Sequence, residues 1–167
     1  TVIEKQNTIA KVPATIYLTA SSLKMKTGQS TTAFKATGFS EGDYVTAVTS
    51  NKPGTVKVTN VNKNGTFKLA AGKKKGSAVV TVTMASKKTA SFKVTVQKAA
   101  VKTTKITTTT KSLILAKGAT YKKLASSITV TPVTSKEKVS YSSSNKKVAT
   151  VSSKGVIKAK KAGTTKI

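Results

Sequence analysis

The sequence of 167 residues contains no cysteine, no histidine and no tryptophan, and it has only four acidic residues. Without cysteine there can be no disulfide bond and no thiolate metal site. Without histidine, and with so few carboxylates, no Ser-His-Asp triad and no pair of catalytic carboxylates is easily assembled. A Ser-Lys dyad is the one arrangement that the composition leaves open. We therefore expect a protein that is not an enzyme and has no cofactor.

Long apolar runs are also missing. No stretch approaches the ~20 apolar residues of a membrane-spanning helix, and the first residues do not form a signal peptide. If the protein is secreted, we expect its targeting segments to lie outside this sequence. No membrane span is predicted.

Positive charge, in contrast, is abundant. All 31 basic residues are lysines, and the formal net charge is +27. Residues 1–99 contain 16 lysines and three acids, and residues 100–167 contain 15 lysines and one acid. The charge is therefore a property of both halves of the chain and not of one basic tail.

Apolar and polar residues alternate with a period of two in several segments, which predicts β-strands with one solvated face. The clearest of these segments are Thr55–Thr59, Phe67–Leu69, Val80–Met84 and Phe92–Val96. Turn signals separate them, of which Asn64-Gly65 is the strongest because both residues tolerate positive φ. No window of ten or more residues has a helical period, so the fold class is predicted to be all-β.

Three blocks of sequence occur twice in the same order. Ser22–Ser30 aligns with Ser112–Thr120 at an offset of 90, Val45–Lys52 with Val139–Lys146 at 94, and Gly65–Leu69 with Gly155–Ala159 at 90. Repeats of ~80 to 90 residues have the size of a small β-sandwich. We predict tandem domains at residues 16–97 and 105–167, joined by a short, stiff linker at 98–104. Residues 1–15 are interpreted as the remnant of a preceding module or a linker.

One part of the second repeat resembles a known family. Tyr141-Ser-Ser-Ser-Asn-Lys-Lys-Val-Ala-Thr-Val151, followed by Gly155-Val-Ile-Lys-Ala159 and Ala162-Gly163-Thr164, is similar to the signature of bacterial immunoglobulin-like domains, group 2. Leu113–Thr120 resembles the early strand pair of that family. The first repeat departs from the pattern, with Ala47 in place of Tyr141 and a three-residue insertion at Lys73–Lys75.

This resemblance implies two tandem Greek-key β-sandwiches without enzymatic activity. It also implies a place in tandem arrays on bacterial surface proteins, adhesins, exported enzymes or phage virions, and no shared set of binding residues. Val148 and Val151 are expected to face the core, with Ile157 and Ala159 on the next strand and Lys158 and Lys160 in solvent. The second domain lacks its last strand, which we expect to be either cut off or supplied by another molecule, for example by Thr1–Ile3.

The candidate site residues are lysines at the corresponding hairpin of each repeat. They are Lys73, Lys74, Lys75, Lys158, Lys160 and Lys161. Lysines on strands also prevent edge-to-edge aggregation, which explains scattered lysines such as Lys57, Lys68 and Lys93. It does not explain the near absence of acids, because a mixed surface would avoid self-repulsion. A polyanionic partner is therefore predicted.

Three other features have simpler interpretations. Glu41-Gly42-Asp43 is too poor in carboxylates for calcium and is predicted to be a turn. The threonine-rich run Thr103–Thr110 is predicted to begin the second domain as a strand, with a glycosylated stalk as the alternative. A Lys-Asn isopeptide crosslink is a minor possibility, because no acid lies in a predicted core strand.

The predicted function is a non-catalytic spacer and adhesion module on a bacterial cell surface or cell wall, with the phage virion surface as the alternative location. Lysine point charges suit diffuse attraction to anionic envelope polymers or acidic glycans. Without arginine or a row of aromatics, specific nucleic-acid recognition is not expected. The alternatives are an adhesin with a specific glycan or protein ligand, and a structural subunit of a phage virion or surface layer.

Overall fold

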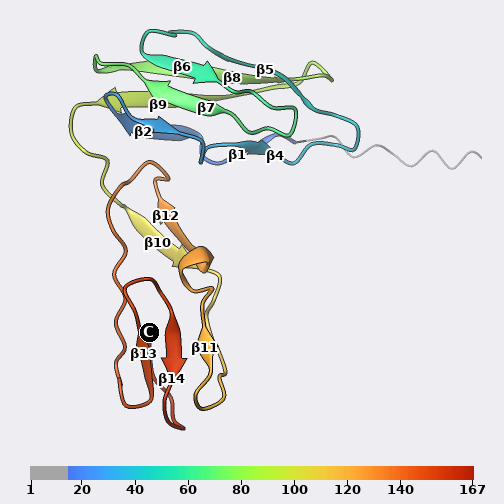
Figure 1. The fold of residues 1–167 in the computed structure, drawn as a ribbon. Helices are drawn as coiled ribbons and strands as arrows, with labels where there is room; N and C mark the ends of the chain where they lie inside the picture. Colours follow the sequence, from blue (N-terminus) through green and yellow to red (C-terminus); the bar gives the residue numbers. More distant parts are fainter. Residues whose placement is uncertain (1–14) are drawn as a thin grey trace, which may run out of the picture. The chain divides into compact units, whose positions relative to one another are not determined.

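A computed structural model describes residues 15–167, whose regular secondary structure is almost entirely β-strand (Figure 1). The chain divides into two compact units, residues 1–99 and 100–167. Helical structure in the described residues is limited to one 3-10 turn, η1 (Ala125–Ser127). In that part of the chain, no helix has the length and hydrophobicity needed to span a membrane. The all-β prediction is confirmed, and the predicted remnant at 1–15 lies outside the described residues except for Thr15.

The larger sheet of the first unit contains four strands. In spatial order they are β2 (Ser22–Lys26), β9 (Thr89–Gln97), β8 (Gly76–Met84) and β5 (Val45–Ser50). β2 runs parallel to β9, whereas β9, β8 and β5 are antiparallel neighbours. The strands predicted at Val80–Met84 and Phe92–Val96 are confirmed as parts of β8 and β9.

The smaller sheet of the first unit contains β3 (Ser30–Thr31), β7 (Lys68–Ala71) and β6 (Val56–Thr59), in that order. A separate pair is formed by β1 (Tyr17–Leu18) and β4 (Ala36–Thr37). The strands predicted around Lys57 and Lys68 are confirmed as β6 and β7. Lys57 and Lys93 are exposed and Lys68 is half-buried, as expected for residues on solvated faces.

Three phenylalanines form the centre of the first unit. Phe34 stacks on Phe92 of β9 with ring centroids 4.0 Å apart, and Phe67, next to β7, lies 6.2 Å from Phe92 and 6.3 Å from Phe34. All three rings are at most 2% exposed. Because Phe67 and Phe92 adjoin strands of different sheets, the rings join the two sheets into one core.

The second unit has two small sheets. β10 (Lys105–Thr108) pairs with β12 (Ile128–Thr131), and β11 (Thr120–Tyr121), β14 (Ile157–Ala159) and β13 (Ala149–Val151) form the other sheet in that order. β10 confirms that the threonine-rich run begins this unit as a strand. The segment Leu113–Leu115, which aligns with β2, is not part of a strand.

The core of the second unit is built on Leu124, Ala149 and Ile157. Half-buried side chains that include Tyr141 and Val151 pack against it. The prediction that Val148 faces the core is wrong, because β13 begins at Ala149 and alternation places Ala149 and Val151 on the same face. The prediction for Ile157 and Ala159 is confirmed, since both are buried.

Strand register changes one of the sequence alignments. Ser30 pairs with Ala70 in the first unit, and Thr120 pairs with Lys158 in the second. If Ser30 corresponds to Thr120, then Ala70 and not Lys68 corresponds to Lys158. The sequence alignment matched the turn glycines Gly65 and Gly155, which both have positive φ. The strand pairing instead shifts the alignment of β14 on β7 by two residues.

The length difference between the units therefore lies in a different loop from the predicted one. Ten residues separate the paired Val58 and Leu69, whereas five separate the equivalent pair Val151 and Ile157. The longer loop joins β6 to β7. The predicted three-residue insertion at Lys73–Lys75 is therefore wrong.

Candidate polyanion-binding site

Of the lysines predicted to bind anions, Lys158 lies in the β13–β14 hairpin, and the others lie in the segments that follow β7 and β14. Lys73, Lys74 and Lys75 join β7 to β8, which belong to different sheets, so the hairpin prediction is wrong for the first unit. Lys158 is the central residue of β14, and Lys160 and Lys161 follow that strand. All six side chains are exposed.

Backbone hydrogen bonds bring distant segments together around Gly72 in the first unit. The Gly72 N–H donates to the Thr55 carbonyl over 2.8 Å, and the Gly72 carbonyl accepts from the Gly28 N–H over 3.1 Å. One residue before Gly28, the Thr27 N–H donates to the Gln97 carbonyl over 2.9 Å. A Cβ at position 72 would run into the carbonyl oxygen of Gly54. Glycine there allows the 53–55 turn to approach closely.

Six exposed lysines lie on these converging segments, and we call this group the first lysine end. It consists of Lys26, Lys52, Lys73, Lys74, Lys75 and Lys98. The sequence analysis missed Lys26, Lys52 and Lys98, because they come from segments far apart in the chain. The hydrogen bonds of Gly72 and Gln97 join these distant segments of the chain. The spacing of residues in the sequence does not predict those bonds.

The second unit repeats this framework. The Gly118 N–H donates to the Ala159 carbonyl over 3.0 Å, and the Ala159 N–H donates to the Ala119 carbonyl over 3.0 Å. The Lys160 N–H donates to the Val148 carbonyl over 2.8 Å. The exposed lysines on these segments form the second lysine end. It consists of Lys117, Lys146, Lys147, Lys160 and Lys161, with Lys158 next to it on β14.

Asp43 lies at the opposite end of the first unit and holds two loops together. Its carboxylate accepts hydrogen bonds from the Ser86 hydroxyl over 2.6 Å and from the backbone amides of Ser86 and Tyr44. The hydrogen bond from the Ser86 side chain contributes most to lowering the pKa of Asp43. Ser86 follows the last residue of β8, whereas the first lysine end adjoins the first residue of that strand. Nine extended residues, roughly 30 Å, therefore separate this acid from those lysines.

The turn predicted at Glu41-Gly42-Asp43 is confirmed, since residues 41 and 42 form a turn in which Gly42 has a φ of +78°. Three or more metal-ligating side chains do not gather at any point among residues 15–167. With its carboxylate bonded to Ser86 and Tyr44, Asp43 acts as a structural acceptor that joins the 40–44 loop to the β8–β9 turn.

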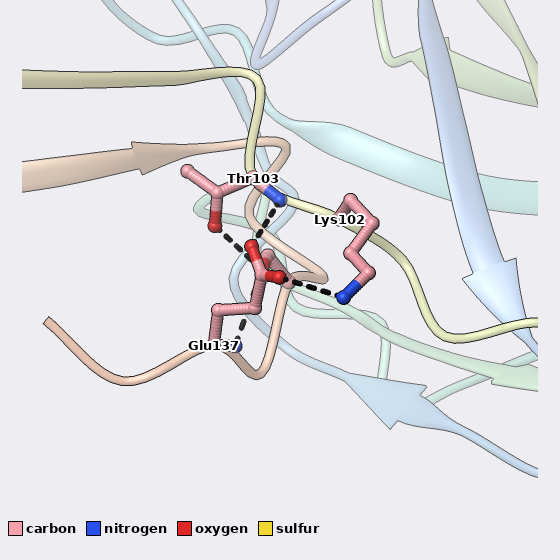
Figure 2. Close-up of polar contacts among 4 residues, drawn as sticks. Lys102, Thr103 and Glu137 are labelled. Atoms are coloured by element: carbon pink, nitrogen blue, oxygen red, sulfur yellow. Dashed lines mark hydrogen bonds and ion pairs between the residues drawn. The ribbon is translucent and has the colours of Figure 1, made fainter.

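Glu137 likewise joins two segments of the second unit (Figure 2). Its carboxylate accepts from the Thr103 N–H over 2.7 Å and lies 3.1 Å from the Lys102 ammonium. The Thr103 and Ser135 hydroxyls are hydrogen-bonded at 2.8 Å. The backbone hydrogen bond from Thr103 is the main cause of the lowered pKa of Glu137. These contacts fasten the entry segment of the unit to the 135–137 loop.

Among the described residues, the lysines of the two ends have no such acidic neighbours. Within residues 15–167, no carboxylate lies within ion-pairing distance of any of them. Each end is therefore a group of amines whose charge is not neutralised locally. Lysine ammonium groups are compact, flexible point charges, suited to attracting an anionic polymer and not to reading a planar ligand.

Comparison with known proteins identifies the second unit. An immunoglobulin-like domain is the class that its strands and sequence signature indicate. Residues 100–167 match the family model described as "Bacterial Ig-like domain (group 2)". The second unit belongs to that family, as the resemblance predicted. No curated protein matches the sequence.

Among solved structures, this chain is similar to parts of an S-layer protein. Domains 4 and 5 of the S-layer protein SbsC are 25% identical over 49% of this chain and 44% of that chain, with a TM-score of 0.41. Domains 5–6 of the same protein are 23% identical over 57% of this chain and 49% of that chain, with a TM-score of 0.44. This chain thus spans less than half of either structure.

Proposed function

We propose that this chain is a non-catalytic module of a bacterial surface protein, and that its two lysine ends hold it against anionic polymers of the cell wall or matrix. The match of the second unit to bacterial immunoglobulin-like domains supports the surface assignment. The recurrence of a lysine group on the same hydrogen-bonded framework in both units supports the choice of binding site. That recurrence is the observation that carries the proposal.

The charge balance favours a polymer over a small anion. The amines of each end come from separate loops and are exposed, so they do not enclose a small ligand. A chain of phosphate or carboxylate groups would contact several amines in succession and release several counterions, which makes binding strong at low salt and weak at high salt. Two ends on one chain would add avidity wherever one polymer reaches both. Wall teichoic acid, a polyol phosphate, is the partner that we propose.

The test compares two variants of equal charge. In the end variant, Lys73, Lys74, Lys75, Lys160 and Lys161 are replaced by Gln. In the matched control, Lys35, Lys57, Lys93, Lys105 and Lys154, which are exposed but lie outside the lysine ends, are replaced by Gln. Binding to purified wall teichoic acid is measured by calorimetry at several salt concentrations.

We expect the end variant to lose on the order of tenfold or more in affinity, and the control much less. The number of amines that contact the polymer sets the salt-dependent part of the binding free energy. Equal losses in both variants would show diffuse attraction without a site at the lysine ends. Unchanged binding of the unmodified chain in ~0.5 M salt, where the Debye length is about 4 Å, would contradict the electrostatic mechanism itself.

A further inference from the structure

An exposed lysine continues the first lysine end along β2. Alternate residues of that strand are buried, with Leu23 and Met25 3% and 0% exposed, while Lys24 and Lys26 lie on the opposite, solvated face. Residues two apart on a strand are separated by roughly 6.6 Å. Lys26 belongs to the first lysine end, so Lys24 extends that group of amines away from the end of the unit and onto the face of the larger sheet.

Polar side chains of the neighbouring strands lie beside this pair of lysines. β9 runs parallel to β2, with Thr95 opposite Lys24 and Gln97 opposite Lys26. Ser77 of β8 pairs with Thr95 on the other side, and their hydroxyl oxygens are 3.5 Å apart. None of these three described strands contains an acidic residue. The face around the two lysines is therefore made of ammonium, hydroxyl and amide groups, which donate hydrogen bonds to anionic oxygens.

The second unit lacks this pair of lysines. In the alignment of the repeats, Ile114 takes the place of Lys24 and Ala116 takes the place of Lys26. The difference lies in the sequence itself, so it does not depend on what adjoins residues 112–116. Amines at these strand positions are thus a property of the first unit alone.

The spacing of the two lysines corresponds to one repeat of glycerol phosphate. Three backbone bonds of an extended peptide advance about 3.3–3.6 Å, so two residues correspond to a chain of six bonds. Six bonds also join consecutive phosphorus atoms that are connected by glycerol, which gives an extended repeat of roughly 7 Å by the same measure. Ribitol has two more carbons, and its repeat of eight bonds extends over roughly 9 Å. An extended glycerol phosphate chain therefore places consecutive phosphates over Lys24 and Lys26.

We propose that the solvated face of β2 binds a glycerol phosphate polymer that lies along the strand, with consecutive phosphates at Lys26 and Lys24. This inference rests on the proposed binding of an anionic polymer at the first lysine end, and it adds the identity of the polyol and the path of the polymer. Each lysine ammonium donates hydrogen bonds to the free oxygens of one phosphate. The Thr95 hydroxyl lies beside this path.

Single-stranded nucleic acid also has six bonds between consecutive phosphates, but the composition of this face favours the polyol. Proteins that bind single strands without sequence preference use aromatic side chains on which the bases stack. The solvated faces of β2 and β9 carry only serine, threonine, lysine and glutamine, and the one ring of these strands, Phe92, is buried. A glycerol chain needs no stacking surface, so it should bind more tightly than oligothymidylate.

The test measures, by calorimetry, the affinities of this chain for synthetic glycerol phosphate and ribitol phosphate oligomers with equal numbers of phosphates. We expect the glycerol oligomer to bind about two- to fivefold more tightly, because one exposed charge pair contributes an effect of that size. Lys24→Gln should remove this preference by weakening the binding of the glycerol oligomer alone. The matched control is Lys57→Gln on β6 of the smaller sheet, which should leave the preference intact.

A gain of affinity gives an independent readout. Ser22 is exposed on the same face of β2, one repeat beyond Lys24. Ser22→Lys should therefore strengthen the binding of the glycerol oligomer by about the same two- to fivefold and leave that of the ribitol oligomer nearly unchanged.

The possible results separate this inference from the proposed function. Equal affinities for the two oligomers, no effect of Lys24→Gln, or tighter binding of oligothymidylate would each overturn the inference. A loss of affinity in the end variant would then still support the lysine ends as the binding site. If the unmodified chain binds none of the oligomers, the proposed function is contradicted as well.

Discussion

The two units use the same framework of hydrogen bonds but enclose cores of very different size. Of the buried hydrophobic residues, all but Val101, Leu124, Ala149, Ile157 and Ala159 belong to the first unit. Most of the difference comes from β8 and β9, which together bury a run of valines with Met84 and Phe92. The Ala71 N–H donates to the Gln29 carbonyl and, equivalently, the Ala159 N–H donates to the Ala119 carbonyl, so this strand register is present in both units.

A second difference is the sequence position of the aromatic residue that packs near the β6–β7 turn and the β13–β14 turn. By strand register, Phe67 corresponds to Gly155. A Cβ added at Gly155 would lie 3.2 Å from the Tyr141 ring, and Tyr141 aligns with Ala47 of the first repeat. The second unit thus has a ring at Tyr141 and no side chain at Gly155, whereas the first unit has a ring at Phe67 and a small residue at Ala47. Cores tolerate such exchanges when the total volume is conserved.

The largest expected effect is a loss of stability confined to one unit. Phe92→Ala removes the ring that stacks on Phe34, and truncation of a buried phenylalanine costs about 3–5 kcal/mol. Urea denaturation followed by residue-resolved NMR should show early unfolding of the first unit, while the second keeps its midpoint. Joint loss of signals from both units would contradict their independence.

A matched pair of leucines tests the difference in burial directly. Leu23→Ala should cost about 2–5 kcal/mol because the side chain is buried in the core of the first unit. Leu113→Ala should cost less than about 1 kcal/mol because that side chain is already 41% exposed. The two free energies of unfolding are measured by the same denaturation experiment. Similar losses in both variants would show that Leu113 is as well covered as Leu23.

A matched pair of turn glycines tests the difference in packing around the loops. Gly65 and Gly155 both have positive φ, so either substitution by Ala costs about 1–2 kcal/mol in backbone strain. A Cβ at Gly65 would also collide with the rigid Ala36 carbonyl oxygen, whereas at Gly155 the contacts of 3.2 Å permit small adjustments. We expect Gly65→Ala to lower the thermal midpoint of its unit more than Gly155→Ala does. The reverse order would contradict this packing.

The smallest effects are expected at the two structural acids. Their folded-state pKa values are lowered, so the ionised carboxylates stabilise the protein above their ordinary pKa range, and this contribution is lost as the pH falls through the folded-state values. Asp43→Asn and Glu137→Gln should therefore lower the urea midpoint at pH 7, and this loss should shrink as the pH falls below the ordinary carboxyl range. A difference that grows with acidity would show the wrong sign for these hydrogen bonds.

Sequence reasoning predicted the strands well where alternation was strong and the residues were large. β6, β7, β8 and β9 were found because valines and phenylalanines alternate with lysines and threonines. It failed at Val148, because residues three apart on a strand point to opposite faces, so Val148 and Val151 do not both face the core. It also aligned Lys158 with Lys68 instead of Ala70, because it matched the turn glycines of two loops that differ in length.

The candidate site was only half visible in the sequence. Runs such as Lys73–Lys75 stand out by themselves, whereas Lys26, Lys52 and Lys98 join them only through the cross-chain hydrogen bonds around Gly72 and Gln97. Convergence of distant segments depends on strand order, which residue spacing along the chain does not reveal. Leu113 is likewise 41% exposed although its local sequence resembles that of β2, because no strand among the described residues pairs with 112–116.

The central claim is that the first unit is a closed sandwich, whereas residues 112–116 of the second pair with no strand among the described residues, and amide hydrogen exchange of this chain tests it most directly. The amides of Leu23–Thr27 should exchange slowly, and those of Leu113–Lys117 on the order of a hundredfold faster or more. Only the first segment pairs with a neighbouring strand among the described residues. Equal protection of the two segments in the isolated monomer would contradict the account.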